Sequence, residues 1–226
     1  MWCIPELTRE YAERMEDVLD LYEKPLNPKE PVVCLDEKPV QLLADARKSI
    51  VADKPGAIFK RDYEYVRGGT ANVFCAVEPK AGRHFTRVTK NRKGPAFAKM
   101  VSRIARAYPG RKTVHLVMDN LSTHGQKSLT DFYGEKLGEK IWGKFTPHYT
   151  PKHASWLDQA EIEIGIFSRQ CLGKDRIGSI PALRRRASAW NRRMNRQRRK
   201  INWRFTALDA RKKFRYKSIG FIKPEH

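Results

Sequence analysis

Three acidic residues stand where a catalytic metal-binding carboxylate would be expected. Asp36 follows the apolar run 32–35, Asp119 follows the apolar run 114–118, and Glu161 lies early in a predicted helix. A carboxylate at the end of an apolar strand is poorly solvated, so its ionised form is costly unless a positive group binds there. Two such aspartates and a helical glutamate, in a basic chain, predict a divalent-metal site that acts on a polyanion.

Each aspartate has an alternative interpretation. Glu37 adjoins Asp36, and because neighbours on a strand face opposite ways, only one of the two can point into a given site. Asp119 could instead form a local cap with Ser122 at the end of its strand. We favour a site role for Asp119, because ligands of open α/β sheets gather beyond the ends of strands.

The predicted helix leaves two glutamates open. We expect Ser155 to cap it, with Asp158 three residues on. At ~100° per residue, the apolar face comprises Leu157, Ala160, Ile164, Phe167 and Cys171. Glu161 and Glu163 flank this face on opposite sides, so periodicity does not choose between them. Asp158 is expected to point away from the face in the first turn, where an interaction with the helix dipole is the simpler interpretation.

Composition indicates the partner. The formal net charge is +21 at pH 7, which points to nucleic acid first and to an anionic membrane second. No apolar stretch is long enough to span a bilayer, and the start lacks a secretory signal pattern. A basic protein of another kind, such as a ribosome-associated one, is the alternative. The four cysteines are scattered, which argues against disulfides or a zinc knuckle and favours a reducing cytoplasm.

The C-terminal region carries a basic helix. Apolar residues recur at helical spacing from Ile180 to Met194. The basic residues predicted to bind DNA are Arg184, Arg185, Arg192, Arg193, Arg196, Arg198, Arg199 and Lys200. A solvated charged face is the alternative, although few acids balance these residues. The tryptophans nearby could stack on bases but are more simply core residues, and we interpret His124 and His148 as structural.

The remaining pattern predicts an α/β fold with a mixed sheet. In the first half of the chain we expect a helix over 6–22, a strand over 32–35, β runs over 63–66 and 72–77 with a turn between them, a turn over 78–82 and a strand over 84–88. These are followed by a helix over 97–107, a buried strand over 113–118 and a helix capped by Ser122 or Thr123. An extended loop over 146–152 then leads to helices from 155 and 180. The strands of Asp36 and Asp119 are expected to be neighbours. We divide the chain into an N-terminal leader helix (1–30), a catalytic domain (31–175) and a basic helical extension (176–226).

Three segments resemble the mariner-like superfamily of DDE transposases, and within it the bacterial insertion-sequence six-thirty family. They are 33–39 (VCLDEKP), 117–124 (VMDNLSTH) and 148–161 (HYTPKHASWLDQAE), and the similarity runs from about residue 2 to 217. The resemblance implies an RNase H-like fold in which Asp36, Asp119 and Glu161 hold two Mg²⁺ or Mn²⁺ ions, with Asp36 bridging both. It favours Glu161 over Glu163, because the family's glutamate closes an Asn-x-x-Glu pattern. This chain has Asp158 in place of that asparagine, which would add a charge near the site.

The resemblance also implies partners and a reaction. Similar transposases cleave and join double-stranded DNA at element ends and targets, often at TA dinucleotides, and a homodimer on DNA is expected. Family members carry an N-terminal helix-turn-helix region that this sequence does not include, so we expect either a truncated copy or a separate DNA-recognition polypeptide. The resemblance to a bacterial family also implies a cytoplasmic protein associated with the nucleoid. Two alternatives stay open at this point: an RNase H-like nuclease that only hydrolyses, and an inactive DNA-binding remnant.

Overall fold

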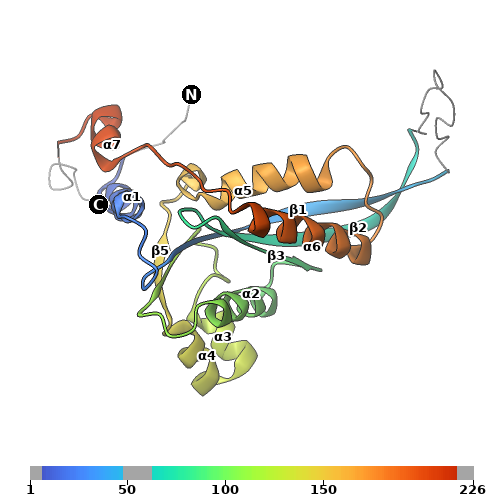
Figure 1. Ribbon diagram of the computed structural model, residues 1–226, viewed down its shortest axis with the longest axis horizontal. Coiled ribbons are helices and arrows are strands. Elements are labelled where there is room, and N and C mark those ends of the chain that lie inside the picture. The colour runs from blue at the N-terminus through green and yellow to red at the C-terminus, as the bar shows by residue number, and fades with distance from the viewer. Residues whose placement is uncertain (1–6, 48–62, 218–226) are drawn as a thin grey trace.

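A five-stranded mixed sheet forms the centre of the protein. The computed structural model describes residues 7–47 and 63–217 (Figure 1). The strands are β1 (Val32–Asp45), β2 (Tyr65–Glu78), β3 (Arg83–Thr89), β4 (Val114–Met118) and β5 (Phe145–Tyr149), in the order β3-β2-β1-β4-β5. The first three form an antiparallel meander, whereas β4 pairs parallel with β1, and β5 pairs parallel with β4. This is the RNase H-like topology, and the predicted fold class is confirmed.

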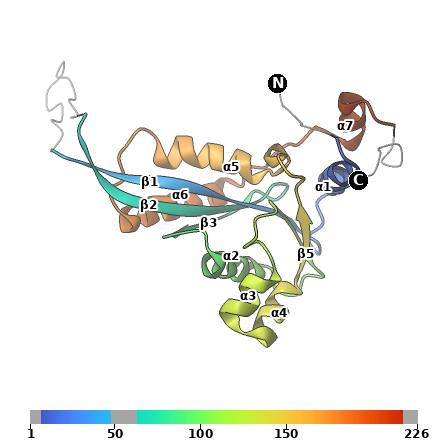
Figure 2. The ribbon, with the colours of Figure 1, turned by 180° about the vertical axis from the view of Figure 1, so that it is seen from behind.

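Helices cover both faces of this sheet. They are α1 (Arg9–Glu23), α2 (Gly94–Ala107), α3 (Gln126–Tyr133), α4 (Glu135–Trp142), α5 (Ala160–Phe167), α6 (Ile180–Gln197) and α7 (Ala207–Phe214). The group α2, α3 and α4 lies on one side of the sheet, and α5 and α6 lie on the other (Figures 1 and 2). No helix in the described part of the chain is long and apolar enough to cross a membrane.

Alternation along β1 assigns its side chains to the two layers. Val33 and Leu35 join the cluster built around α2, whereas Cys34 lies on the opposite face with α1 and the residues just before α5. Further along, Val40 and Leu42 pack with α5 and α6. Because side chains alternate strictly in an extended strand, Asp36 shares the face of Cys34, and Glu37 shares the face of α2.

Several predicted elements occur as expected. The helices over 97–107 and from 180 are α2 and α6, and the buried strand is β4. The apolar positions predicted on α6 are buried from Leu183 to Met194, and the chain's described cysteines are buried free thiols. The turn over 78–82 is present, with Gly82 at a φ of 61°, a conformation that suits glycine.

The predicted turn between two β runs is wrong. Residues 65–78 form one continuous strand, and the glycines make an irregularity opposite Leu42, where the register shifts between Gln41 and Leu43. Gly68 is needed there for close packing, since a Cβ on it would lie 2.5 Å from the carbonyl oxygen of Gly178. Glycine in a strand here marks a bulge and a close backbone approach instead of a chain reversal.

Two predicted boundaries and one predicted loop are also wrong. Residues 145–149 form β5, because an edge strand tolerates the missing N–H of Pro147. Neither Ser122 nor Thr123 caps α3, which begins after Gly125, because the intervening residues form a turn. Ser155 begins only a short 3-10 turn, and α5 itself starts at Ala160.

Candidate active site

The sheet register places the two aspartates side by side. Cys34 on β1 pairs with Val117 on β4 in a parallel ladder. Two residues further along each strand are Asp36 and Asp119, so the same register sets them across from each other, with Asp119 directly after the end of β4. The prediction that these acids lie on neighbouring strands is confirmed.

The structure distinguishes the two glutamates of α5. Glu163 is fully buried, and its Oε1 lies 2.7 Å from Nδ1 of His84 on β3. Glu161 is exposed in the first turn of α5, on the face of the sheet toward which Asp36 points. The predicted apolar face of this helix is buried throughout. Only Glu161 of the pair therefore presents an oxygen to solvent near the aspartates.

Burial, followed by neighbouring acids, determines the electrostatics of Asp36. Burial raises the pKa of Asp36 to about 7, and the charges of Glu161, Glu37 and Asp119 add to the increase. The backbone N–H of Glu37 donates to Asp36 Oδ1 at 2.7 Å and offsets part of the increase. Burial and the neighbouring acids therefore both disfavour the ionised form of Asp36.

A buried histidine compensates Asp119. Burial acts to raise the pKa of Asp119, but His124, whose Nδ1 lies 2.6 Å from Oδ1, outweighs it and the pKa is lowered. The backbone N–H of Leu121 also donates to this oxygen at 3.2 Å. Burial alone would lower the pKa of His124, whereas its contacts with Asp119 and Glu37 raise it to about 9. Sequence reasoning did not assign His124 to the site.

Asp158 departs from its predicted orientation. It is 2% exposed, and its Oδ1 accepts a hydrogen bond of 2.8 Å from the N–H of Ala160 at the start of α5. Burial raises the pKa of Asp158 well above its usual range, and the nearby charge of Asp36 adds to this effect. Burial therefore disfavours the charged form of Asp158 at this position.

The donor set suits a hard divalent cation. Asp36, Asp119 and Glu161 offer carboxylate oxygens, and the charges of Glu161 and Asp119 both add to the raised pKa of Asp36, so these acids lie near it. Among the described residues, no group of three or more acidic, histidine or cysteine side chains is arranged to hold a metal ion by itself. Mg²⁺ sites commonly use one or two carboxylates and complete their shell with substrate oxygens and water, so these residues fit such an ion.

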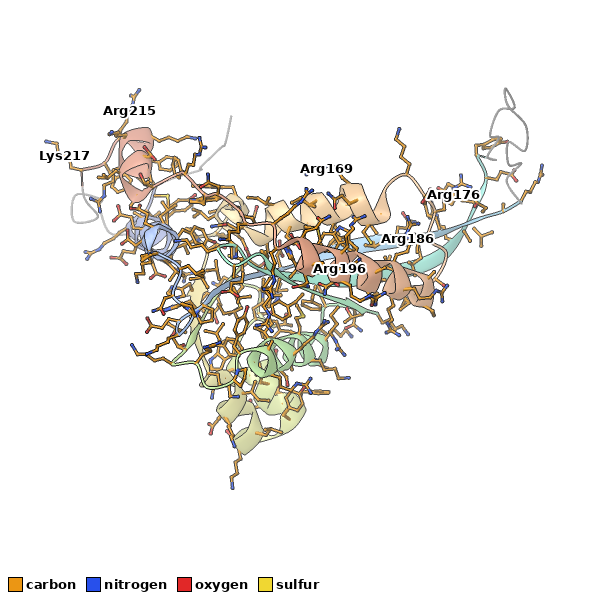
Figure 3. The ribbon with its side chains drawn as sticks, viewed as in Figure 1. Arg169, Arg176, Arg186, Arg196, Arg215 and Lys217 are labelled. Atoms are coloured by element: carbon orange, nitrogen blue, oxygen red, sulfur yellow. The ribbon has the colours of Figure 1, made fainter. Side chains whose placement is uncertain are left out.

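A cleft beside Asp119 and the exposed basic residues of α6 are the two surfaces that could meet DNA. A cleft of ≈ 840 Å³ borders Asp119 and is also lined by Arg14, Lys152 and His153. All eight basic residues predicted to bind DNA are exposed, on α6 and directly after it. The labelled Arg186 and Arg196 of α6 lie on the α5 side of the sheet, away from α2 to α4 (Figure 3).

Two further interpretations concern histidine and tryptophan. His148 bonds to Asp17 and His115, at 2.7 and 2.9 Å, and is structural as predicted. Trp190 is buried in the core beneath α6, where its ring packs edge-on against Phe167 at 5.1 Å. It is therefore a core residue, as the simpler interpretation proposed.

The family model for the DDE superfamily endonuclease matches residues 31–184, which is more than half of the chain. The chain belongs to the DDE superfamily of endonucleases. No curated protein matches this DDE chain.

Solved structures share its fold. They include the Mos1 mariner paired end complex with Mn (TM-score 0.56, 14% identity, 88% of this chain and 62% of that chain) and the Mos1 Strand Transfer Complex (TM-score 0.54, 16% identity, 85% and 57%). A third is the Mos1 transposase paired-end complex with left transposon end (TM-score 0.55, 14% identity, 93% and 62%). At this identity the likeness shows the fold. This DDE chain spans about three fifths of the length of those chains.

Proposed function

We propose that this chain is the catalytic domain of a DDE transposase, which cleaves DNA strands and transfers an insertion sequence to a new site. The observation that supports this most strongly is the placement of Asp36 and Asp119 on and directly after two adjacent interior strands, with Glu161 in the first turn of α5 near enough for its charge to act on Asp36. The family match and the Mos1 fold add to it.

The three carboxylates would hold two Mg²⁺ or Mn²⁺ ions, with Asp36 shared between them. When bound, such ions activate the attacking oxygen and stabilise the leaving one in an in-line displacement at phosphorus. Asp36 would contribute to holding both ions, because the charges of both Glu161 and Asp119 act on it. Asp158 contributes by fixing the start of α5, and hence the place of Glu161, through the Ala160 N–H.

The basic residues on and after α6 would hold double-stranded DNA, both element ends and target. A protein that neutralises phosphates releases condensed counterions, so affinity should fall steeply with salt. Replacing Arg192 and Arg196 by Gln should reduce the slope of log affinity against log salt by about 0.9 for each phosphate that is no longer neutralised. We further propose a homodimer on DNA, a separate N-terminal recognition polypeptide, TA targets, and the division into 1–30, 31–175 and 176–226.

A joining assay tests this function. Pre-cleaved double-stranded end DNA is incubated with a supercoiled plasmid and Mn²⁺, and wild type is compared with Asp119→Asn, which keeps the side-chain volume. Metal-dependent joined product, lost in the variant, is expected. Nicking without joining, also lost in the variant, would instead identify the protein as a nuclease that only hydrolyses DNA. DNA binding with no reaction from either protein would contradict an active catalytic domain.

A further inference from the structure

A buried histidine links the two catalytic strands. His124 Nδ1 lies 2.6 Å from Asp119 Oδ1, and its Nε2 lies 3.3 Å from Glu37 Oε2. The side chains of His124 and Glu37 are 0% and 2% exposed. Glu37 is the residue whose backbone N–H donates to Asp36 at 2.7 Å. A continuous path of contacts therefore runs from one catalytic aspartate to the other through the protein interior.

The imidazole of His124 is fixed from several directions. Its ring stacks on Phe97 of α2, with centroids 4.7 Å apart and an interplanar angle of 23°. Its backbone N–H donates to Leu121 O at 2.7 Å, and its carbonyl accepts from the hydroxyl of Tyr149 at 2.9 Å. Three separate elements thus hold this residue: α2, the turn after β4, and β5. A ring fixed in this way constrains the positions of the Asp119 and Glu37 carboxylates that contact it.

Asp119 needs such support because its own surroundings are open. Its side chain is 47% exposed, and it stands just beyond the last residue of β4, where no ladder bond holds it. Both contacts to its carboxylate, from Leu121 N and His124 Nδ1, fall on Oδ1. The other oxygen, Oδ2, is the one that these contacts leave for a ligand.

We infer that His124 and Glu37 are positioning residues, which set the orientation of the Asp119 carboxylate relative to Asp36 and so determine how tightly the pair holds a divalent ion. The inference rests on the proposed metal site. Groups that orient metal ligands typically change metal affinity or activity by about 10–100-fold when removed. Glu37 reaches His124 because it lies on the face of β1 opposite to Asp36, which assigns these adjacent acids different tasks.

Two substitutions of His124 separate orientation from packing. His124→Phe keeps an aromatic ring against Phe97 but removes both nitrogens. His124→Asn retains a donor close to the position of Nδ1, so part of the contact with Asp119 survives. Glu37→Gln weakens the far end of the path and leaves the ring in place. His148→Phe is the matched control, because His148 also bridges two side chains, those of Asp17 and His115, but contacts neither Asp36 nor Asp119.

The measurement is Mn²⁺ affinity in the full chain, from the electron paramagnetic resonance signal of free Mn²⁺. Melting in EDTA and binding of a non-specific DNA duplex are followed in parallel. We expect His124→Phe to weaken Mn²⁺ binding by about 10-fold or more, with a smaller loss for His124→Asn and Glu37→Gln. DNA affinity and the His148→Phe control should be unchanged.

The outcomes are distinguishable. If Asp119→Asn loses Mn²⁺ binding but folded His124→Phe and Glu37→Gln bind as wild type does, the positioning role is overturned while the metal site stands. If Asp119→Asn itself binds Mn²⁺ as wild type does, the proposed metal site fails first. Should His124→Phe not fold, wild-type affinity in Glu37→Gln and His124→Asn together overturns the inference.

Discussion

Replacing Asp36 by Asn should stabilise the metal-free protein while abolishing catalysis. Burial and neighbouring carboxylates raise the pKa of Asp36 from 3.8 to about 7. As the pH rises, the unfolded chain therefore loses the Asp36 proton before the folded protein does. The free energy of unfolding accordingly decreases between these two pKa values. At about 1.4 kcal/mol per pKa unit, the roughly 3-unit difference corresponds to up to about 4 kcal/mol above pH 7. Asn also keeps an oxygen that can accept from the N–H of Glu37.

The advantage of the Asn variant should depend on pH. Below pH ~4 the carboxyl is neutral in both states, so the variant has no advantage there. Between pH 5 and pH 8 its advantage in the free energy of unfolding should grow by about 2–3 kcal/mol. Urea denaturation in EDTA at these two pH values measures the difference. Asp131→Asn is the control, since Asp131 pairs with Lys127 on the surface and should change stability by less than about 1 kcal/mol.

Metal addition provides the opposite test on the same proteins. A ligand that binds only the folded state raises stability by RT ln(1 + [L]/Kd). Mn²⁺ should therefore stabilise wild type and leave Asp36→Asn nearly unchanged. A variant that is no more stable than wild type at pH 8, or whose advantage does not vary with pH, would refute the electrostatic reasoning.

Three further predictions address the surroundings of the site. Asp158→Asn should raise stability at neutral pH and have no effect below pH ~4, because burial raises the pKa of Asp158; an Asn variant less stable at pH 7 in urea would contradict this. Glu163→Ala should cost about 1–3 kcal/mol in the same assay, because it leaves Nδ1 of the buried His84 without its partner, and an unchanged stability would count against that pair. In thermal melting, Gly82→Ala should lower the melting temperature more than Gly110→Ala does. Both glycines have a positive φ, but only at Gly82 would an added Cβ lie 2.5 Å from the backbone at the end of α6. Equal losses would show that the backbone strain at positive φ, and not this close approach, determines the cost.

Local pattern was sufficient for most of the framework. The apolar runs before Asp36 and Asp119 predicted two neighbouring strands, and the continuous apolar run over 113–118 predicted a strand buried on both faces. Turn residues around Gly82 predicted the reversal between β2 and β3. These features depend on neighbours in the sequence, which is why composition and periodicity captured them.

Features set by distant packing were out of reach. Glu161 and Glu163 lie at similar angles on either side of the apolar face of α5, so helical periodicity does not distinguish them. Glu163 is the buried one because it contacts His84, on a strand 79 residues earlier in the chain. His124 lies in a turn, and nothing periodic indicates that its ring enters the interior beside Glu37. The cap predicted at Thr123 is wrong for a similar reason. The residues after β4 form a turn from which Leu121 and His124 contact Asp119, and α3 begins only after Gly125.

The proposed function requires that these carboxylates bind the catalytic metal, and a change of ligand tests this most directly. Asp119→Cys replaces a hard oxygen by a softer sulfur, which disfavours Mg²⁺ more than Mn²⁺. Plasmid nicking and joining by the variant should be lost in Mg²⁺ and partly restored in Mn²⁺, while wild type reacts with both ions. Glu161→Gln should be inactive with either ion. Equal activity of Asp119→Cys in Mg²⁺ and Mn²⁺, or activity in Glu161→Gln, would contradict the assignment.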